Sequence, residues 1–169
     1  MSVVHVARAA WRLLTADPRH GQIAVLASLL VFGLARLDFD VRPLQIAVTI
    51  GTALAVQWLG DTWVRTPTRA GLKSALISSL SLCLLLRAND VAWAAAGAAI
   101  AVGSKFLIRV HGKHVFNPTN GALAALLLTT DAVWVSPGQW GTTAIFAFAM
   151  ACAGLAVVHR SARSDVTVA

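Results

Sequence analysis

Six apolar runs alternate with short polar connectors along this chain, and no other feature of the sequence constrains its fold as strongly. The runs cover residues 22–35, 44–59, 72–86, 91–108, 121–135 and 142–158. A helix needs roughly 20 apolar residues to cross a hydrocarbon core of about 30 Å, and several runs are shorter. We expect the short ones to borrow flanking residues or to be broken helices sheltered by protein. The predicted fold is an all-α, multi-pass transmembrane helical bundle of about six helices.

The composition favours a lipid bilayer as the surroundings of this chain and argues against nucleic acid. Hydrophobic residues make up 57% of the 169 residues and charged residues only 12%, so there is too little polar surface to cover a domain in water. A net charge of +7 would suit nucleic acid only if the basic residues shared one solvated face. They lie between the apolar runs instead, so no nucleic-acid partner is predicted.

The lysines and arginines divide unequally between alternate connectors. Eleven of the 14 fall in the N-terminal tail, the second and fourth connectors and the C-terminal tail, and three fall in the other connectors. Basic residues collect on the cytoplasmic side of a membrane protein, so both termini are predicted to be cytoplasmic. The chain then divides into an interfacial amphipathic segment (1–20), a transmembrane domain (21–159) and a cytoplasmic tail (160–169).

The connector between the fourth and fifth runs has the most unusual composition. Residues 104–123, SKFLIRVHGKHVFNPTNGAL, combine three basic residues, two histidines and an Asn-Pro-Thr-Asn turn. One interpretation is a cytoplasmic loop in which Pro118 and Gly121 end and restart helices. The other is a binding site for an anionic group, because backbone N–H groups at a helix start, here near Lys113, favour negative charge. The two histidines have no carboxylate or cysteine beside them, so no metal site is predicted.

The stretch GKHVFNPTNGAL, residues 112–123, resembles the Gly-Lys-x-x-Phe-Asn-Pro signature of the NqrB/RnfD family, the membrane subunits of flavin-dependent redox pumps. NqrB belongs to the sodium-translocating NADH:quinone reductase, and RnfD belongs to the Rnf electron-transport complex. The chain is most similar to their shorter relatives, the UnbU-type membrane proteins of enediyne biosynthesis and the RnfD-like proteins. The likeness extends over DPRHGQIAVLASLLVFGL, LKSALISSLSLCLLLR and WVSPGQWGTTAIFAF, and so covers residues 17–167.

The resemblance implies a fold related to urea transporters, in which inverted repeats of about five helices meet at broken segments near the midplane. It also implies FMN, which those subunits carry on a Thr in a Ser-Gly-Ala-Thr motif at the outer face. Thr143 takes the acceptor position here, while Trp140 and Thr142 replace the Ser and Ala. The alternative is a plain outer turn with Thr142 as a helix N-cap. The candidate cofactor-binding residues are Gly112, Lys113, Asn117, Pro118, Asn120 and Thr143.

The resemblance also implies further subunits and a cellular location. Members of the family normally continue with a second hydrophobic half, whereas this sequence ends at Ala169. Alone, it is expected to leave the Asn-Pro turn and Lys105 facing lipid, so we predict a homo-oligomer or a partner membrane subunit. The small residues of 94–103 and 147–154 would let helices approach closely in lipid. The implied location is a bacterial inner membrane.

Three functions are compatible with these patterns. The first is membrane electron transfer coupled to ion transport, with a bound flavin or a nearby quinone. The second is a channel or transporter half for a small solute, suggested by polar Gln45, Gln57 and Asn120 near the run ends. The third is an accessory membrane protein of natural-product biosynthesis. The sequence has no Ser-His-Asp arrangement, phosphate-binding Gly-rich loop or carboxylate pair on one helix face, so we expect no catalytic residue and no enzyme acting alone.

Overall fold

The computed structural model describes residues 17–64, 69–110, 113–136 and 144–160, and within them the chain is mostly helical. Six helices form there, which confirms the all-α prediction and the expected number of helices. The helices are α2 (Pro18–Arg36), α3 (Pro43–Val64), α4 (Arg69–Leu85), α5 (Val91–Leu107), α6 (Pro118–Thr129) and α7 (Ala144–Arg160). Four short strands join them: β1 (Leu86–Ala88), β2 (Arg109–Val110), β3 (Lys113–His114) and β4 (Val133–Val135).

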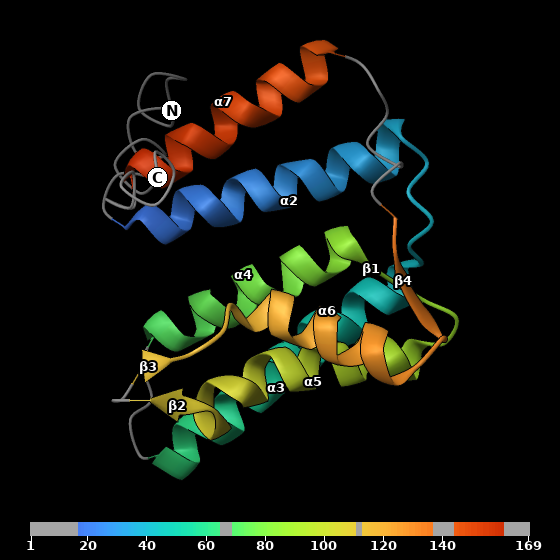
Figure 1. The fold of residues 1–169 in the computed structure, drawn as a ribbon. Coiled ribbons are helices and arrows are strands. Elements are labelled where there is room, and N and C mark those ends of the chain that lie inside the picture. The colour runs from blue at the N-terminus through green and yellow to red at the C-terminus, as the bar shows by residue number, and fades with distance from the viewer. Residues whose placement is uncertain (1–16, 65–68, 111–112, 137–143, 161–169) are drawn as a thin grey trace, which may run out of the picture.

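Consecutive helices run in opposite directions, so the bundle has two distinct ends (Figure 1). The start of α2 and the end of α7 lie at one end, together with the β2–β3 hairpin. The β1–β4 pair lies at the other end. The helix ends that flank the connectors rich in lysine and arginine therefore lie at a common end of the bundle.

Local capping explains where three of the helices begin. The carboxylate of Asp17 accepts a hydrogen bond from the Arg19 N–H at the start of α2, and that of Asp90 accepts one from the Ala92 N–H at the start of α5. Asn117 caps α6, because its side-chain oxygen accepts from the N–H groups of Thr119 and Asn120. Pro18 and Pro118 follow two of these caps at a position where the helix needs no N–H donor. The helix starts are therefore local properties of the chain.

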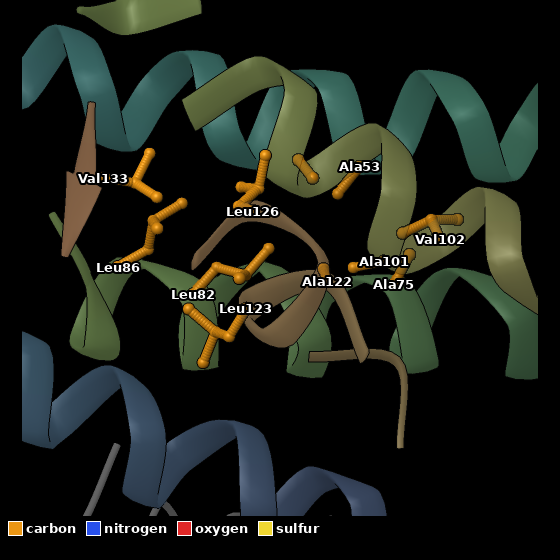
Figure 2. Close-up of a cluster of buried hydrophobic side chains, with 11 residues drawn as sticks. Ala53, Ala75, Leu82, Leu86, Ala101, Val102, Ala122, Leu123, Leu126 and Val133 are labelled. Atoms are coloured by element: carbon orange, nitrogen blue, oxygen red, sulfur yellow. The ribbon is translucent and has the colours of Figure 1, made fainter. Parts of the chain in front are cut away.

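The largest buried cluster joins α3, α4, α5 and α6. Figure 2 shows Leu82, Leu123 and Leu126 close together in this cluster, with alanines nearby. The alanines are almost completely buried, which lets the helix backbones approach closely. These alanines are Ala53, Ala75, Ala98, Ala101 and Ala122. A second cluster, containing Leu30, Phe39 and Leu84, packs α2 against α4.

The two stretches of small residues behave differently. Ala94, Gly97, Ala98 and Ala101 are buried along the face of α5, in agreement with the packing expected for residues 94–103. The stretch 147–154 lies on α7, where its described side chains are mostly exposed. Because α7 packs against α2 only at one side, its small residues are left without a close neighbour in the described part of this chain.

The fifth apolar run is a broken helix and not one continuous span. Its helical part, α6, ends at Thr129, and residues 133–135 form β4. β4 pairs antiparallel with β1, with Leu86 opposite Val135 and Ala88 opposite Val133. The β-branched Thr129 and Thr130 and the exposed Asp131 weaken the helix at this point. Pairing with β1 supplies the backbone hydrogen bonds that α6 no longer makes.

Two helices, α2 and α3, are long and apolar enough to cross a membrane by length and composition. Residues 71–85 of α4 and the whole of α5 are apolar but shorter. A helix of 17 residues such as α5 is about 25 Å long at 1.5 Å per residue, somewhat less than a typical hydrocarbon core. The multi-pass membrane arrangement therefore stays a prediction.

Candidate functional site

Three of the six predicted cofactor-binding residues lie together at the start of α6. Asn117 caps the helix, Pro118 is its first residue, and Asn120 is exposed within the first turn. Lys113 belongs to β3, a strand that lies at the same end of the bundle. Gly112 and Thr143 lie outside the described residues, so the structure places neither of them. The part of the candidate site that can be described is the first turn of α6.

The first backbone amides of α6 are already hydrogen-bonded within the turn. Asn117 Oδ1 accepts from the N–H groups of Thr119 and Asn120, at 3.1 and 3.4 Å. The Gly121 N–H donates to the Asn117 carbonyl oxygen at 2.9 Å. An anion at this turn would have to displace the Asn117 side chain. The binding capacity of the region therefore depends more on the surrounding side chains than on these amides.

Those side chains line a polar groove between α2, α4 and the start of α6. The groove has a volume of about 350 Å³. Its lining contains hydroxyl and amide groups and one guanidinium, and no carboxylate of the described residues. The lining residues are Arg19, Gln22, Ser74, Ile77, Ser78, Ser81, Leu85, Asn117, Pro118, Thr119 and Asn120. The groove thus includes every predicted site residue whose side chain the structure describes.

Serines on one face of α4 form the floor of the groove. Ser74, Ser78 and Ser81 are spaced four and three residues apart, so they lie on one side of the helix. From Ser74 to Leu85 the lining follows α4 for about 16 Å at 1.5 Å per residue. Thr119 Oγ1 donates to the Ser78 carbonyl oxygen at 3.5 Å and joins α6 to this face. The sequence analysis did not predict this stripe, although the serine spacing in LKSALISSLSLCLLLR would have revealed it.

A second polar stripe lies on the buried face of α3. Gln45, Thr49, Gln57 and Asp61 are all buried, and each is four or eight residues from the next. Ala53 fills the remaining position of this face. The sequence analysis named Gln45 and Gln57 as polar residues near run ends, and it missed Asp61. Polar side chains on one inward face are a costly arrangement in an apolar interior unless they find partners.

Gln57 and Asp61 interact directly near the end of α3. Gln57 Nε2 donates to Asp61 Oδ1 at 2.9 Å. Gly71 on α4 lies against the pair: a Cβ atom at Gly71 would lie 2.7 Å from Gln57 Nε2 and 3.0 Å from Asp61 Oδ2. The absence of a side chain at Gly71 therefore lets α4 approach the pair closely. We call Gln57 and Asp61 the buried polar cluster.

Lys105 connects the buried polar cluster to the groove. Its Nζ donates to Ser74 Oγ at 3.1 Å, and Ser74 also lines the groove. The Asp61 carboxylate favours the positive charge of Lys105 electrostatically, whereas the Arg19 guanidinium opposes it. The expectation that Lys105 faces lipid in a single chain is wrong, because the side chain reaches from α5 to α4 inside the bundle. Five helices, α2 to α6, therefore contribute polar groups to the groove and the cluster beside it.

An ion pair holds the rim of the groove in place. Lys73 Nζ lies 2.8 Å from Asp17 Oδ2 and joins the start of α2 to α4. The hydrogen bond from Lys73, assisted by the bond from the Arg19 N–H, holds the pKa of Asp17 below its ordinary value. Asp17 therefore stays ionised at neutral pH, and it keeps the neighbouring Arg19 at the mouth of the groove.

Comparison with known proteins adds no relative to this picture. No protein-family model, no curated protein and no solved structure matches the chain.

Proposed function

We propose that this chain is an integral membrane subunit whose polar groove forms part of a path for an ion or a small hydrophilic solute. The assembly to which it belongs is of the ion-translocating electron-transport kind, and its location is a bacterial inner membrane with both termini in the cytoplasm. The observation that carries the proposal is the hydroxyl-lined groove that follows most of α4. Polar groups inside a membrane bundle characteristically mark substrate or ion pathways.

The apolar exterior supports the membrane part of this proposal. Large hydrophobic side chains are exposed on the outer faces of several helices, among them Val31 on α2, Trp63 on α3 and Phe148 on α7. Soluble monomers rarely expose apolar patches that extend over many elements. The polar stripe of α3 lies on an inner face instead. Polar residues inside and apolar residues outside form the arrangement that a bilayer favours.

The electron-transfer part of the proposal rests on the resemblance at residues 112–123. FMN on Thr143 would be at the outer face, and Thr143 lies outside the described residues. The intact mass of the protein purified from native membranes decides this point. A flavin-sized mass increment that disappears in Thr143→Ala would support electron transfer, and an unmodified mass without flavin fluorescence would remove covalent FMN from the proposal.

A small-solute conduit is the second candidate, favoured by the composition of the groove. A volume of about 350 Å³ suits a small molecule, and hydroxyl and amide groups can replace the hydrogen bonds of its hydration shell. Arg19 is the one charged lining residue in the described part of the chain, and the hydroxyl and amide groups around it suit a neutral solute. The buried carboxylate of Asp61 suits a cation instead, so the two candidates differ in the expected charge of the transported species.

The exposed small residues of α7 support a partner helix. Ala147 and Ala151 are exposed on this helix, and a second copy or another subunit could approach its backbone closely there. This agrees with the homo-oligomer or partner subunit expected from the resemblance. The partner would also cover part of the apolar surface of α7.

The groove is tested by narrowing it in purified protein reconstituted into liposomes. Ser81→Val replaces a lining hydroxyl by methyl groups, and we expect it to reduce the flux of the transported ion or solute several-fold. Ser28→Val makes the same change on α2 outside the groove and should leave flux unchanged. If Ser81→Val and the wild type conduct equally well, the groove is not the path.

A further inference from the structure

We propose that Gln57 and Asp61 form a binding site for a small monovalent cation inside the helix bundle. Lys105 links the site to the groove, because its ammonium interacts with Asp61 and donates to Ser74, which lines the groove. This inference rests on the proposed transport function, because it names the class of ion that the path would carry.

The pair has more acceptor atoms than donors. Gln57 Nε2 is used by Asp61 Oδ1, while Gln57 Oε1 has no hydrogen-bond partner among the described residues. Asp61 has no cation in direct contact, since the only ion pair within the described part of the chain joins Lys73 to Asp17. Exchanging the oxygen and nitrogen of the Gln57 amide would place two acceptors face to face. An unmatched amide oxygen therefore lies beside a carboxylate that no cation among the described side chains contacts.

Burial makes this excess of acceptors expensive. Gln57 is 4% exposed and Asp61 is 9% exposed. A buried carbonyl oxygen without a partner costs about 1–3 kcal/mol, and a buried carboxylate without a counter-charge costs more. A cation held by carboxylate and carbonyl oxygens satisfies both groups at once, and such hard oxygen ligands are those that alkali and alkaline-earth ions prefer. The arrangement is thus matched to a ligand that provides positive charge.

The neighbouring charges select a monovalent ion. The site contains one carboxylate, which the positive charge of Lys105 partly offsets, and the Arg19 guanidinium acts on Lys105 in turn. Lys105 bonds Ser74 and not Asp61, so its ammonium compensates the carboxylate only at a distance. A divalent ion would meet more repulsion than one carboxylate can offset. Lys105 would therefore weaken cation binding without occupying the site.

The test measures binding directly, without transport. Full-length protein in nanodiscs is heated in NaCl, LiCl or KCl, with choline chloride keeping the ionic strength constant. We expect the unfolding midpoint to rise and saturate with at least one of the three cations, because a ligand that binds the folded state stabilises it. Asp61→Asn should abolish the saturable rise. Asp131→Asn removes an exposed carboxylate and should leave it unchanged.

Two further variants keep the test decisive if Asp61→Asn fails to fold. Gly71→Ala keeps both ligands but pushes against Gln57 Nε2 and Asp61 Oδ2, and we expect it to raise the apparent Kd several-fold. Lys105→Gln removes the opposing charge and should lower the apparent Kd several-fold. If choline supports the same midpoint as all three cations, or if neither variant shifts the Kd, the site is overturned. Saturable binding with no flux in liposomes would keep the site and remove the transport function.

Discussion

Arg87 is the most deeply buried charged residue in the described part of the chain, with 2% of its surface exposed. Its Nη1 donates to the carbonyl oxygens of Cys83 and Leu86, at 3.0 and 2.9 Å, and its guanidinium lies 5.4 Å from the centre of the Phe39 ring. The last carbonyls of a helix have no partner within the helix. Arg87 supplies partners for those at the end of α4, and it joins this end to the connector after α2.

This role predicts that Arg87→Lys is destabilising although it keeps the charge. Lysine lacks the planar fork that reaches several carbonyl oxygens at once, so about 1–3 kcal/mol of stability should be lost. The unfolding midpoint of the purified protein in detergent measures the loss. Arg36→Lys makes the same change at an exposed position in the last turn of α2, and its midpoint should match that of the wild type. Equal midpoints for both variants would show that Arg87 does not stabilise α4.

Among the described helices, α6 is the shortest, and its first turn forms one wall of the groove. It has 12 residues and is therefore about 18 Å long, too short to cross a hydrocarbon core. The β1–β4 pair continues the segment, and its antiparallel pairing satisfies backbone hydrogen bonds that α6 no longer makes. One face of α6 packs on α4 and α5, and the opposite face has no neighbour among the described residues.

A pair of identical substitutions tests which face of α6 packs inward. Leu126 is 2% exposed and belongs to the main buried cluster, whereas Leu128 is 86% exposed. Leu126→Ala should cost about 2–4 kcal/mol, because it removes buried contacts and leaves a cavity. Leu128→Ala should cost less than about 0.5 kcal/mol. Chemical unfolding in mixed micelles compares the two, and a larger loss for Leu128→Ala would mean that α6 is rotated from the orientation described.

Across the described bundle, the alternating helix directions bring the helix ends that flank the basic connectors to one end. A bilayer would place that end in the cytoplasm, since basic segments are retained there. The groove mouth at Arg19 and the hairpin of β2 and β3 would then also face the cytoplasm. The β1–β4 pair would lie at the outer surface.

Cysteine labelling in intact cells tests this orientation. In a background with Cys83→Ala and Cys152→Ala, single cysteines replace Asn89 and Arg109, which are exposed at opposite ends of the bundle. A membrane-impermeant maleimide should label Asn89→Cys from outside and reach Arg109→Cys only after the cells are opened. Labelling of both sites in intact cells would contradict a bundle that crosses the membrane.

Local sequence patterns were sufficient to predict the helical class, the number of helices and most of their ends. These follow from short-range physics, because apolar runs must be buried or face lipid, and caps such as Asp17, Asp90 and Asn117 act within a few residues. The same patterns located the turn at residues 117–120 as unusual. The break in the fifth run was not expected at Thr129, because pairing with β1 depends on a segment distant in sequence.

Packing between distant segments settled which polar residues meet. Helical spacing shows that Gln57 and Asp61 share a face of α3, but it cannot show whether that face meets Gly71, lipid or water. Likewise, the sequence presents Lys105 as a basic residue of a connector, and only the fold brings Ser74 opposite it. Spacing along one helix cannot show which residues of other helices it meets, because a helix has several faces. The packing of the neighbouring helices selects the face that turns inward.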